Sequence, residues 1–159
     1  MMESEIRLAK YREATLLAAM SRDLIEEGLG WSWTPPRVMR SLSDPETNAI
    51  VAVVDNKIAG FALMKYFTEH AHLTLFAVNP AYRRRGIGKA LFNWLAETAS
   101  VAGILRINLE VRAANPAARE FYRQVGFVEG ETVRGYYRGI EAAIRMECRL
   151  GADRDIPLS

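Results

Sequence analysis

A basic, glycine-rich segment, Arg83-Arg84-Arg85-Gly86-Ile87-Gly88-Lys89, carries the clearest chemical signal of the chain. It follows an apolar run, Leu73 to Val78, and leads into a helix-forming segment that starts at Ala90. This order predicts strand, turn and helix, and a helix start offers unpaired backbone N–H groups at the positive end of the helix dipole. Glycines let these N–H groups approach an anion closely, so the segment predicts a phosphate site.

Two common phosphate-binding loops do not match this segment. A Walker loop needs four residues between its glycines and then Lys-Ser or Lys-Thr, whereas one residue separates Gly86 from Gly88 and Ala90 follows Lys89. A dinucleotide-binding fingerprint needs a third glycine, and Leu91 occupies that position. What remains is Arg-x-x-Gly-x-Gly between a strand and a helix; the alternative is a basic helix start at the protein surface.

Strand and helix periodicities predict the elements that must position this segment. Strands are expected at 5–9, 49–54, 57–67, 72–78, 105–111, from 127 onward and at 142–150, and helices at 11–29, from 35 or 36, at 86–102 and at 116–125. Asp55-Asn56 suits a two-residue hairpin turn, because both residues tolerate positive φ. Asn115 is expected to cap the last helix, and Gly126 to follow its end. The order βααβββαβαββ predicts a mixed α/β sheet with helices on both faces.

Length and composition predict one domain, residues 1–150, followed by a polar tail, residues 151–159. Half of the 159 residues are hydrophobic and the net charge is +2, so the positive charge of the basic segment is local. Local charge beside a glycine turn favours a small phosphorylated ligand over a nucleic acid. The single cysteine, Cys148, excludes an internal disulfide. With no leader recognised and no apolar run of about 18 residues, the protein is expected in the cytoplasm, away from membranes.

A second block of residues follows the basic segment: Leu109-Glu110-Val111-Arg112, Asn115, Tyr122 and Gly126-Phe127. Together the two blocks resemble the GNAT acetyltransferase superfamily, whose acetyl-CoA signature Gln/Arg-x-x-Gly-x-Gly/Ala matches Arg83, Gly86 and Gly88. The resemblance covers roughly residues 57–150 and is strongest to the bacterial ribosomal-protein alanine N-acetyltransferases. It implies a single-domain GNAT-like fold whose central, mostly antiparallel sheet is splayed at its middle.

The resemblance implies acetyl-CoA as the co-substrate, without a metal, and places its pyrophosphate at the backbone N–H groups of the basic segment. The arginine side chains there add attraction that salt screens. The strand segment before it, 76–78, is expected to pair with the pantetheine arm through its backbone, where one N–H polarises the thioester carbonyl. Because only the backbone is used, the same segment can also be a plain core strand. The expected cofactor-binding residues are Phe76, Ala77, Val78, Arg83, Arg84, Arg85, Gly86, Ile87, Gly88, Lys89 and Asn115.

Three residues are candidates for proton transfer. Glu110 resembles the general base of this branch, and its alternative role is a solvent-facing strand carboxylate. His72 is a second candidate base because imidazole titrates near neutral pH; its alternative role is a hydrogen-bonded or exposed histidine. Tyr122 resembles the general acid that protonates the departing thiolate, and the alternative is a core aromatic side chain.

The expected acceptor is a protein N-terminal α-amine, whose pKa of about 7.7–8.0 lies well below the lysine value of about 10.4. Tyr136 and Tyr137 match a tyrosine pair that holds the substrate peptide in N-terminal acetyltransferases, and Trp31 and Trp33 are candidates for lining the acceptor groove. The alternatives for these aromatic residues are cover over a sheet edge and loop anchoring. A small-molecule amine is the second acceptor hypothesis, and a non-catalytic CoA-binding module is the third. No nucleic acid or membrane partner is expected, and the protein is expected to be a monomer or homodimer.

Overall fold

The computed structural model describes residues 4–151. Within them, the α-helices and strands follow the predicted order βααβββαβαββ, with two short 3-10 turns added at Tyr11–Glu13 and Pro80–Tyr82. The strands are β1 Glu5–Leu8, β2 Thr47–Val54, β3 Lys57–Tyr66, β4 His70–Val78, β5 Arg106–Arg112, β6 Val128–Tyr137 and β7 Glu141–Arg149. The helices are α1 Ala14–Leu24, α2 Pro35–Leu42, α3 Ile87–Val101 and α4 Pro116–Gln124. Apart from Gly151, the predicted polar tail lies outside the described residues.

The strands form a seven-stranded sheet in the order β1-β2-β3-β4-β5-β7-β6. The pairs β1–β2, β2–β3, β5–β7 and β6–β7 are antiparallel, and the pair β4–β5 is parallel. This parallel pairing joins His70–His72 to Arg106–Asn108, although β4 continues to Val78 and β5 to Arg112. The mostly antiparallel sheet is therefore confirmed.

The chain divides into two compact units. The first comprises the described residues up to Tyr66 together with Leu73–Leu95, and the second comprises Phe67–His72 together with the described residues from Ala96 onward. Strand β4 and helix α3 each contribute residues to both units.

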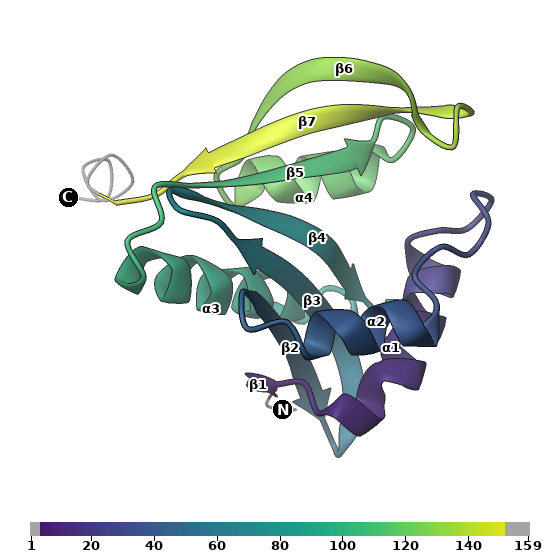
Figure 1. The fold of residues 1–159 in the computed structure, drawn as a ribbon, viewed down its shortest axis with the longest axis vertical. Coiled ribbons are helices and arrows are strands. Elements are labelled where there is room, and N and C mark those ends of the chain that lie inside the picture. The colour runs from purple at the N-terminus through teal and green to yellow at the C-terminus, as the bar shows by residue number, and fades with distance from the viewer. Residues whose placement is uncertain (1–3, 152–159) are drawn as a thin grey trace. The chain divides into compact units, whose positions relative to one another are not determined.

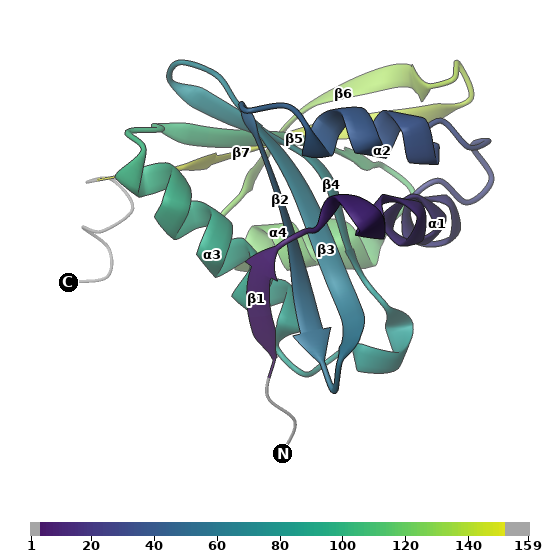
Figure 2. The ribbon, with the colours of Figure 1, turned by 60° about the horizontal axis from the view of Figure 1, so that its bottom comes forward.

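In the first unit, helices cover both faces of β3, as predicted. Helices α1 and α2 lie side by side (Figure 1) and bury Leu17 and Val38 in one cluster with Phe61 of β3. On the alternate face of β3, a Cβ added to Gly60 would lie 3.2 Å from the side chain of Leu91 in α3. Strands β1, β2 and β3 run side by side at this end of the sheet (Figure 2), so the first unit has a core on either side of its strands.

In the second unit, β5 separates an apolar face from a polar face. Ile107, Leu109 and Val111 are buried, whereas the alternate residues of the strand are partly exposed. After the end of α4, the chain passes close to this apolar face. A Cβ added to Gly126 would lie 3.5 Å from the sulfur of Cys148, the residue of β7 that is opposite Ile107. The polar face of β5, defined here as Arg106, Asn108, Glu110 and Arg112, carries the side chains discussed below.

Three local predictions are confirmed. Asp55 and Asn56 have φ values of 51° and 64°, which is the left-handed geometry of a type I′ hairpin turn. The Oδ1 atom of Asn115 accepts a hydrogen bond of 3.1 Å from the backbone N–H of Ala118, so it caps α4. Gly126 follows the end of that helix with φ of 115°.

The first helix is shorter than predicted. It begins at Ala14 after a 3-10 turn and ends at Leu24, not at residue 29. The reason is Glu26, whose backbone N–H donates to the carbonyl oxygen of Ser21 at 2.8 Å and closes the helix. Leu16, an apolar residue of this helix, is 48% exposed.

Strand boundaries also differ, because backbone partners decide them. Strand β4 begins at His70 and not at residue 72, so His72 lies inside the strand. Leu105 precedes β5 and is 52% exposed; its N–H donates to the carbonyl oxygen of Glu69. Strand β2 begins at Thr47, two residues earlier than expected. The remaining strand ends agree with the predicted ones or differ from them by one residue.

Candidate active site

The predicted phosphate segment forms a sharp bend in the first unit, between the 3-10 turn and α3. Arg84 and Gly86 have φ values of 63° and 76°, a left-handed conformation that glycine adopts without strain. The first hydrogen bond of α3 runs from the N–H of Ala90 to the carbonyl oxygen of Gly86 at 2.9 Å. The N–H groups of Ile87, Gly88 and Lys89 therefore precede it at the positive end of the helix, where an anion is favoured.

Side chains leave this bend accessible. Arg83, Arg84, Arg85 and Lys89 are exposed, while Ile87 is buried and anchors the start of α3. The Arg85 guanidinium lies 5.7 Å from the ring centre of Tyr82. A Cβ added to Gly86 would meet no atom within 4 Å. The geometry thus fits a phosphate ligand held by backbone N–H groups, with the cationic side chains around it.

The predicted pantetheine strand lies in the same unit. Ala77 is buried in the core cluster, whereas Phe76 and Val78 are partly exposed. The backbone of β3 approaches it closely, since a Cβ added to Gly60 would lie 2.9 Å from the carbonyl oxygen of Ala77. Both a core role for Ala77 and a backbone role for Phe76–Val78 are compatible with this arrangement.

Two predicted catalytic residues meet in the second unit. The Nε2 atom of His72 lies 2.6 Å from Oε1 of Glu110, and the two side chains are 32% and 15% exposed. The hydroxyl of Tyr136 donates to the same carboxylate oxygen at 3.2 Å. The carboxylate of Glu110, one candidate base, is therefore in contact with His72, the other candidate base, and with Tyr136, a candidate substrate-binding residue.

Hydrogen bonding keeps this carboxylate ionised. The bond from His72 is the largest influence and lowers the pKa of Glu110, although burial acts in the opposite direction. Tyr136 and the guanidinium of Arg145 lower the Glu110 pKa further. An ionised carboxylate can orient a neighbouring imidazole and stabilise the positive charge that the ring carries when it takes up a proton.

Tyr122 lies in the apolar interior of the second unit. It is 9% exposed, and its ring makes edge-to-face contacts with Phe121 and Phe127 at centroid distances of 5.5 Å. Burial, followed by the neighbouring phenol of Tyr137, raises the pKa of Tyr122 far above its ordinary value. Its hydroxyl therefore stays protonated at neutral pH, as a general acid must, and the packing role is also present.

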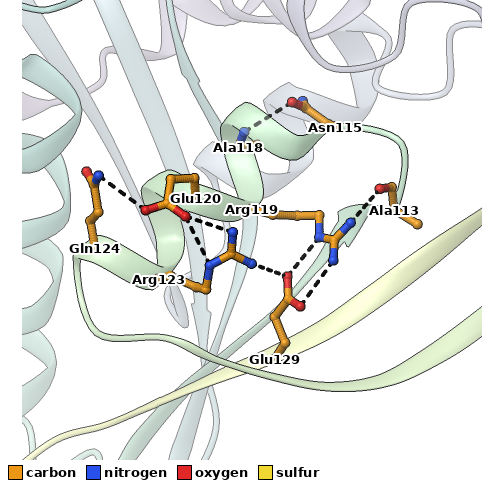
Figure 3. A network of polar contacts seen from close by, with 8 residues as sticks. All are labelled: Ala113, Asn115, Ala118, Arg119, Glu120, Arg123, Gln124 and Glu129. Atoms are coloured by element: carbon orange, nitrogen blue, oxygen red, sulfur yellow. Dashed lines mark hydrogen bonds and ion pairs between the residues drawn. The ribbon is translucent and has the colours of Figure 1, made fainter.

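Asn115 stands at the start of α4 within a network of charged side chains (Figure 3). Arg119 donates to both carboxylate oxygens of Glu129 at 2.8 and 3.1 Å, and also to the carbonyl oxygen of Ala113 at 3.0 Å. Arg123 adds a bond of 2.9 Å to Glu129. These contacts hold the turn before α4, and with it the position of the Asn115 side chain.

The predicted acceptor residues divide into two groups. Tyr136 and Tyr137 lie edge to face at 4.9 Å at the end of β6, and Tyr136 is 43% exposed beside Glu110. In the first unit, the Nε1 of Trp31 donates to the carbonyl oxygen of Ala18 at 3.2 Å. Trp33 packs against the core cluster and lies 3.9 Å below the guanidinium of Arg37. Both tryptophans therefore anchor their loop, whichever further role they have.

The strand next to β5 contributes a charged residue, Arg145 of β7, that the sequence patterns did not identify as part of the site. Arg145 lies opposite Glu110 in the β5–β7 register, with Nε 3.6 Å from Oε2 of Glu110. It also donates to Oε1 of Glu131 at 2.6 Å. Opposite charges on separate strands are visible in the sequence, but the register that brings them together is not.

Two further properties concern the described residues as a whole. Between residues 4 and 151, no group of three or more His, Cys, Asp or Glu side chains is arranged to hold a metal ion. None of the helices described here has the length and apolar character needed to cross a membrane.

Comparisons with known proteins agree on one family. The sequence profile described as "Acetyltransferase (GNAT) family" matches residues 16–127. The chain is 38% identical over 95 residues to the ribosomal protein bS18-alanine N-acetyltransferase of Salmonella typhimurium, an alignment that covers 58% of this chain and 64% of that protein. It is 30% identical over 103 residues to the catalytic subunit of the N-terminal acetyltransferase B complex of Arabidopsis thaliana, covering 62% and 59%. The alignments thus span less than two thirds of each of these relatives.

A solved structure extends the likeness over almost the whole chain. The crystal structure of the ribosomal-protein-S18-alanine N-acetyltransferase from Escherichia coli has a TM-score of 0.80 with this chain at 27% sequence identity. The match covers 94% of this chain and 95% of that one.

Proposed function

Because the chain belongs to the GNAT family of acetyltransferases, we propose that it transfers the acetyl group of acetyl-CoA to the N-terminal α-amine of a protein. One of the similar proteins is named as the catalytic subunit of an N-terminal acetyltransferase complex, and another as an alanine N-acetyltransferase of a ribosomal protein. An acceptor of that kind would place the reaction in the cytoplasm.

The bend at Arg83–Lys89 would hold the pyrophosphate of acetyl-CoA. Its fit rests on the left-handed backbone at Arg84 and Gly86 and on the amides of Ile87, Gly88 and Lys89, which precede the first hydrogen bond of α3. When bound, acetyl-CoA supplies an activated thioester carbonyl. The exposed arginines contribute attraction that weakens with salt, so the backbone carries most of the specificity.

The observation that carries the proposal is the 2.6 Å contact between His72 and Glu110. The pair would take the proton that the acceptor amine loses as its nitrogen bonds to the acyl carbon. A carboxylate with a lowered pKa is a weak base, and this suits an α-amine better than lysine. The pKa gap of about 2.6 between these amines corresponds to roughly 3.5 kcal/mol of additional deprotonation work.

Tyr122 would supply the second proton. As the carbon–sulfur bond breaks, its hydroxyl would protonate the departing thiolate. Tyr136, which already donates to Glu110, would orient the acceptor beside the pair. Each proton is then accounted for: one leaves the amine for the His72–Glu110 pair, and one passes from Tyr122 to sulfur.

Acceptor profiling tests this proposal. CoA release should occur with a peptide that starts with alanine, and not with the same peptide when its N-terminus is blocked and a lysine is internal. Glu110→Gln should lower kcat by about 10²-fold or more while the thermal shift on adding acetyl-CoA persists. Glu147→Gln is the matched control, because Glu147 lies on the neighbouring strand and pairs with Arg106 and Arg149.

Two outcomes of the acceptor profiling would contradict the proposal and indicate another function. CoA release with polyamines or amino-acid-like amines, but not with peptides, would identify a small-molecule acetyltransferase. Binding of acetyl-CoA without release on any amine would identify a CoA-binding module.

A further inference from the structure

Arg145 lies between two carboxylates on the polar face of the second unit. Its Nε is 3.6 Å from Oε2 of Glu110, and its terminal nitrogen is 2.6 Å from Oε1 of Glu131. His72 and Tyr136 contact the other oxygen of Glu110, Oε1. One oxygen of the Glu110 carboxylate therefore contacts the Tyr136 hydroxyl and the His72 imidazole, and the other lies near the Arg145 guanidinium.

The charged and titratable groups that face Glu110 come from three neighbouring strands. Strand β4 contributes His72, β6 contributes Tyr136 and the nearby Tyr137, and β7 contributes Arg145. Glu131 of β6 acts on this group through Arg145. The remaining charges of the polar face are engaged elsewhere, since Arg112 pairs with Glu141 at 2.7 Å and Arg106 lies 3.8 Å from Glu147.

We propose that Arg145 is a positioning residue that sets the proton affinity of the His72–Glu110 pair, and that Glu131 opposes it by drawing the guanidinium away. This inference rests on the proposed function, in which the pair takes the proton of the acceptor amine. Arg145 acts through Glu110 and needs no contact with the substrate.

The sign of each neighbouring charge decides whether it favours or disfavours a proton on the His72–Glu110 pair. Arginine stays protonated at any working pH, so Arg145 favours the ionised carboxylate and disfavours a proton on the pair. In agreement, Arg145 is among the causes that lower the Glu110 pKa. Glu131 has the opposite effect twice: its own negative charge favours a proton nearby, and its short bond holds the guanidinium back from Glu110. His72 lies 2.6 Å from Glu110, so a change of charge beside the carboxylate also acts on the imidazole.

Replacing Arg145 or Glu131 by glutamine should therefore change the proton affinity of the His72–Glu110 pair in opposite directions. Arg145→Gln removes the cation, so the pair should bind its proton more tightly. Glu131→Gln removes the opposing anion and releases Arg145 toward Glu110, so the pair should bind its proton less tightly. A merely structural role for these residues predicts loss of order in both variants and no such reversal.

Proton NMR of the imidazoles measures this directly. The chain has two histidines, His70 and His72, and the signal that disappears in His70→Gln assigns the other. We expect the titration midpoint of His72 to rise by about half a pH unit in Arg145→Gln, the size typical of a partly exposed ion pair. It should fall in Glu131→Gln and return toward the wild-type value in the double variant.

Two controls make the measurement specific. Arg145→Lys keeps the charge and should keep the wild-type midpoint. Arg149→Gln removes a charge from the same face of β7, where Arg149 is paired with Glu147, and should leave the midpoint unchanged. Equal midpoints in Arg145→Gln, Glu131→Gln and the wild type, or shifts of the same sign, would overturn the inference.

The pH dependence of kcat at saturating substrates distinguishes this inference from the proposed function. Parallel shifts in the NMR midpoint and in the acid limb of kcat support both. A shifted NMR midpoint with an unchanged kcat profile supports the role of Arg145 and overturns the role of the pair as the base.

Discussion

The imidazole of His72 contacts Glu110, although the residue opposite His72 in the parallel register is Asn108. The contact is diagonal, two residues further along β5, and brings Nε2 within 2.6 Å of Oε1. Diagonal neighbours on adjacent strands are within reach of long side chains. The contact therefore depends on the register of β4 against β5, and it joins two residues that are 38 positions apart in the chain.

Gly88→Val should abolish acetyl-CoA binding. A branched side chain at the second position of α3 would cover the amides that precede its first hydrogen bond, and we expect the Kd to rise by more than about 100-fold, or about 2.7 kcal/mol. Isothermal titration with acetyl-CoA measures this. Ser100→Val, on an exposed position of the same helix, controls for the low helix propensity of valine and should bind normally. Unchanged affinity in Gly88→Val would show that the pyrophosphate of acetyl-CoA does not bind at this bend.

Gly86→Ala should act by backbone strain alone. The added Cβ meets no atom within 4 Å, but φ is 76°, and a left-handed residue with a side chain costs about 1–2 kcal/mol. We expect a lower melting temperature and a partial loss of acetyl-CoA affinity, smaller than in Gly88→Val. A melting temperature equal to that of the wild type would contradict the left-handed conformation.

Tyr122→Phe should lower kcat and leave acetyl-CoA binding intact. The ring contacts with Phe121 and Phe127 at 5.5 Å do not use the hydroxyl, so the fold should persist. Because a thiolate leaves fairly well unaided, the loss should be near the lower limit for general acids, about 10²-fold. Single-turnover kinetics with saturating acetyl-CoA measures it, and full turnover in this variant would leave Tyr122 with its packing role only.

Glu26→Ala should destabilise the first unit. The carboxylate of Glu26 is 7% exposed and accepts hydrogen bonds from the Ser21 hydroxyl at 2.8 Å and from the backbone N–H and hydroxyl of Ser32 at 2.7 Å. Removing it leaves these donors without an acceptor in a buried place, at a cost of about 3 kcal/mol. Urea unfolding measures the loss. Glu27→Ala, at an exposed neighbouring position, should change stability by less than about 0.5 kcal/mol.

Stability should fall when the pH drops below about 5. Hydrogen bonding from Arg7 lowers the pKa of Glu13, and that from His72 lowers the pKa of Glu110. A carboxyl group whose folded pKa is lowered stabilises the fold above its unfolded pKa of about 4.3, and this contribution is lost as the pH falls through the folded value. Urea midpoints between pH 7 and 3 should therefore be flat and then decline, less steeply in Glu110→Gln. A rise on acidification would contradict the sign.

Local chemistry made much of this protein predictable from its sequence. Asp55-Asn56 tolerates left-handed backbone, Asn115-Pro116 begins a helix, and Gly86 permits the bend before α3; each depends on a few neighbouring residues. Alternation in 105–111 predicts the polar and apolar faces of β5, although Leu105 lies before the strand and is exposed. The order of the elements and the bend before α3 follow from such local signals.

Tertiary structure decided what depends on partners distant in the chain. The base candidate became a pair because β4 lies beside β5 with His72 opposite Asn108, which brings the imidazole within reach of Glu110. Arg145 joins Glu110 only through the β5–β7 register. A sequence specifies which residues carry charge, but the register between strands decides which charges lie close together, and the distance between them sets how strongly each affects its neighbour's proton affinity.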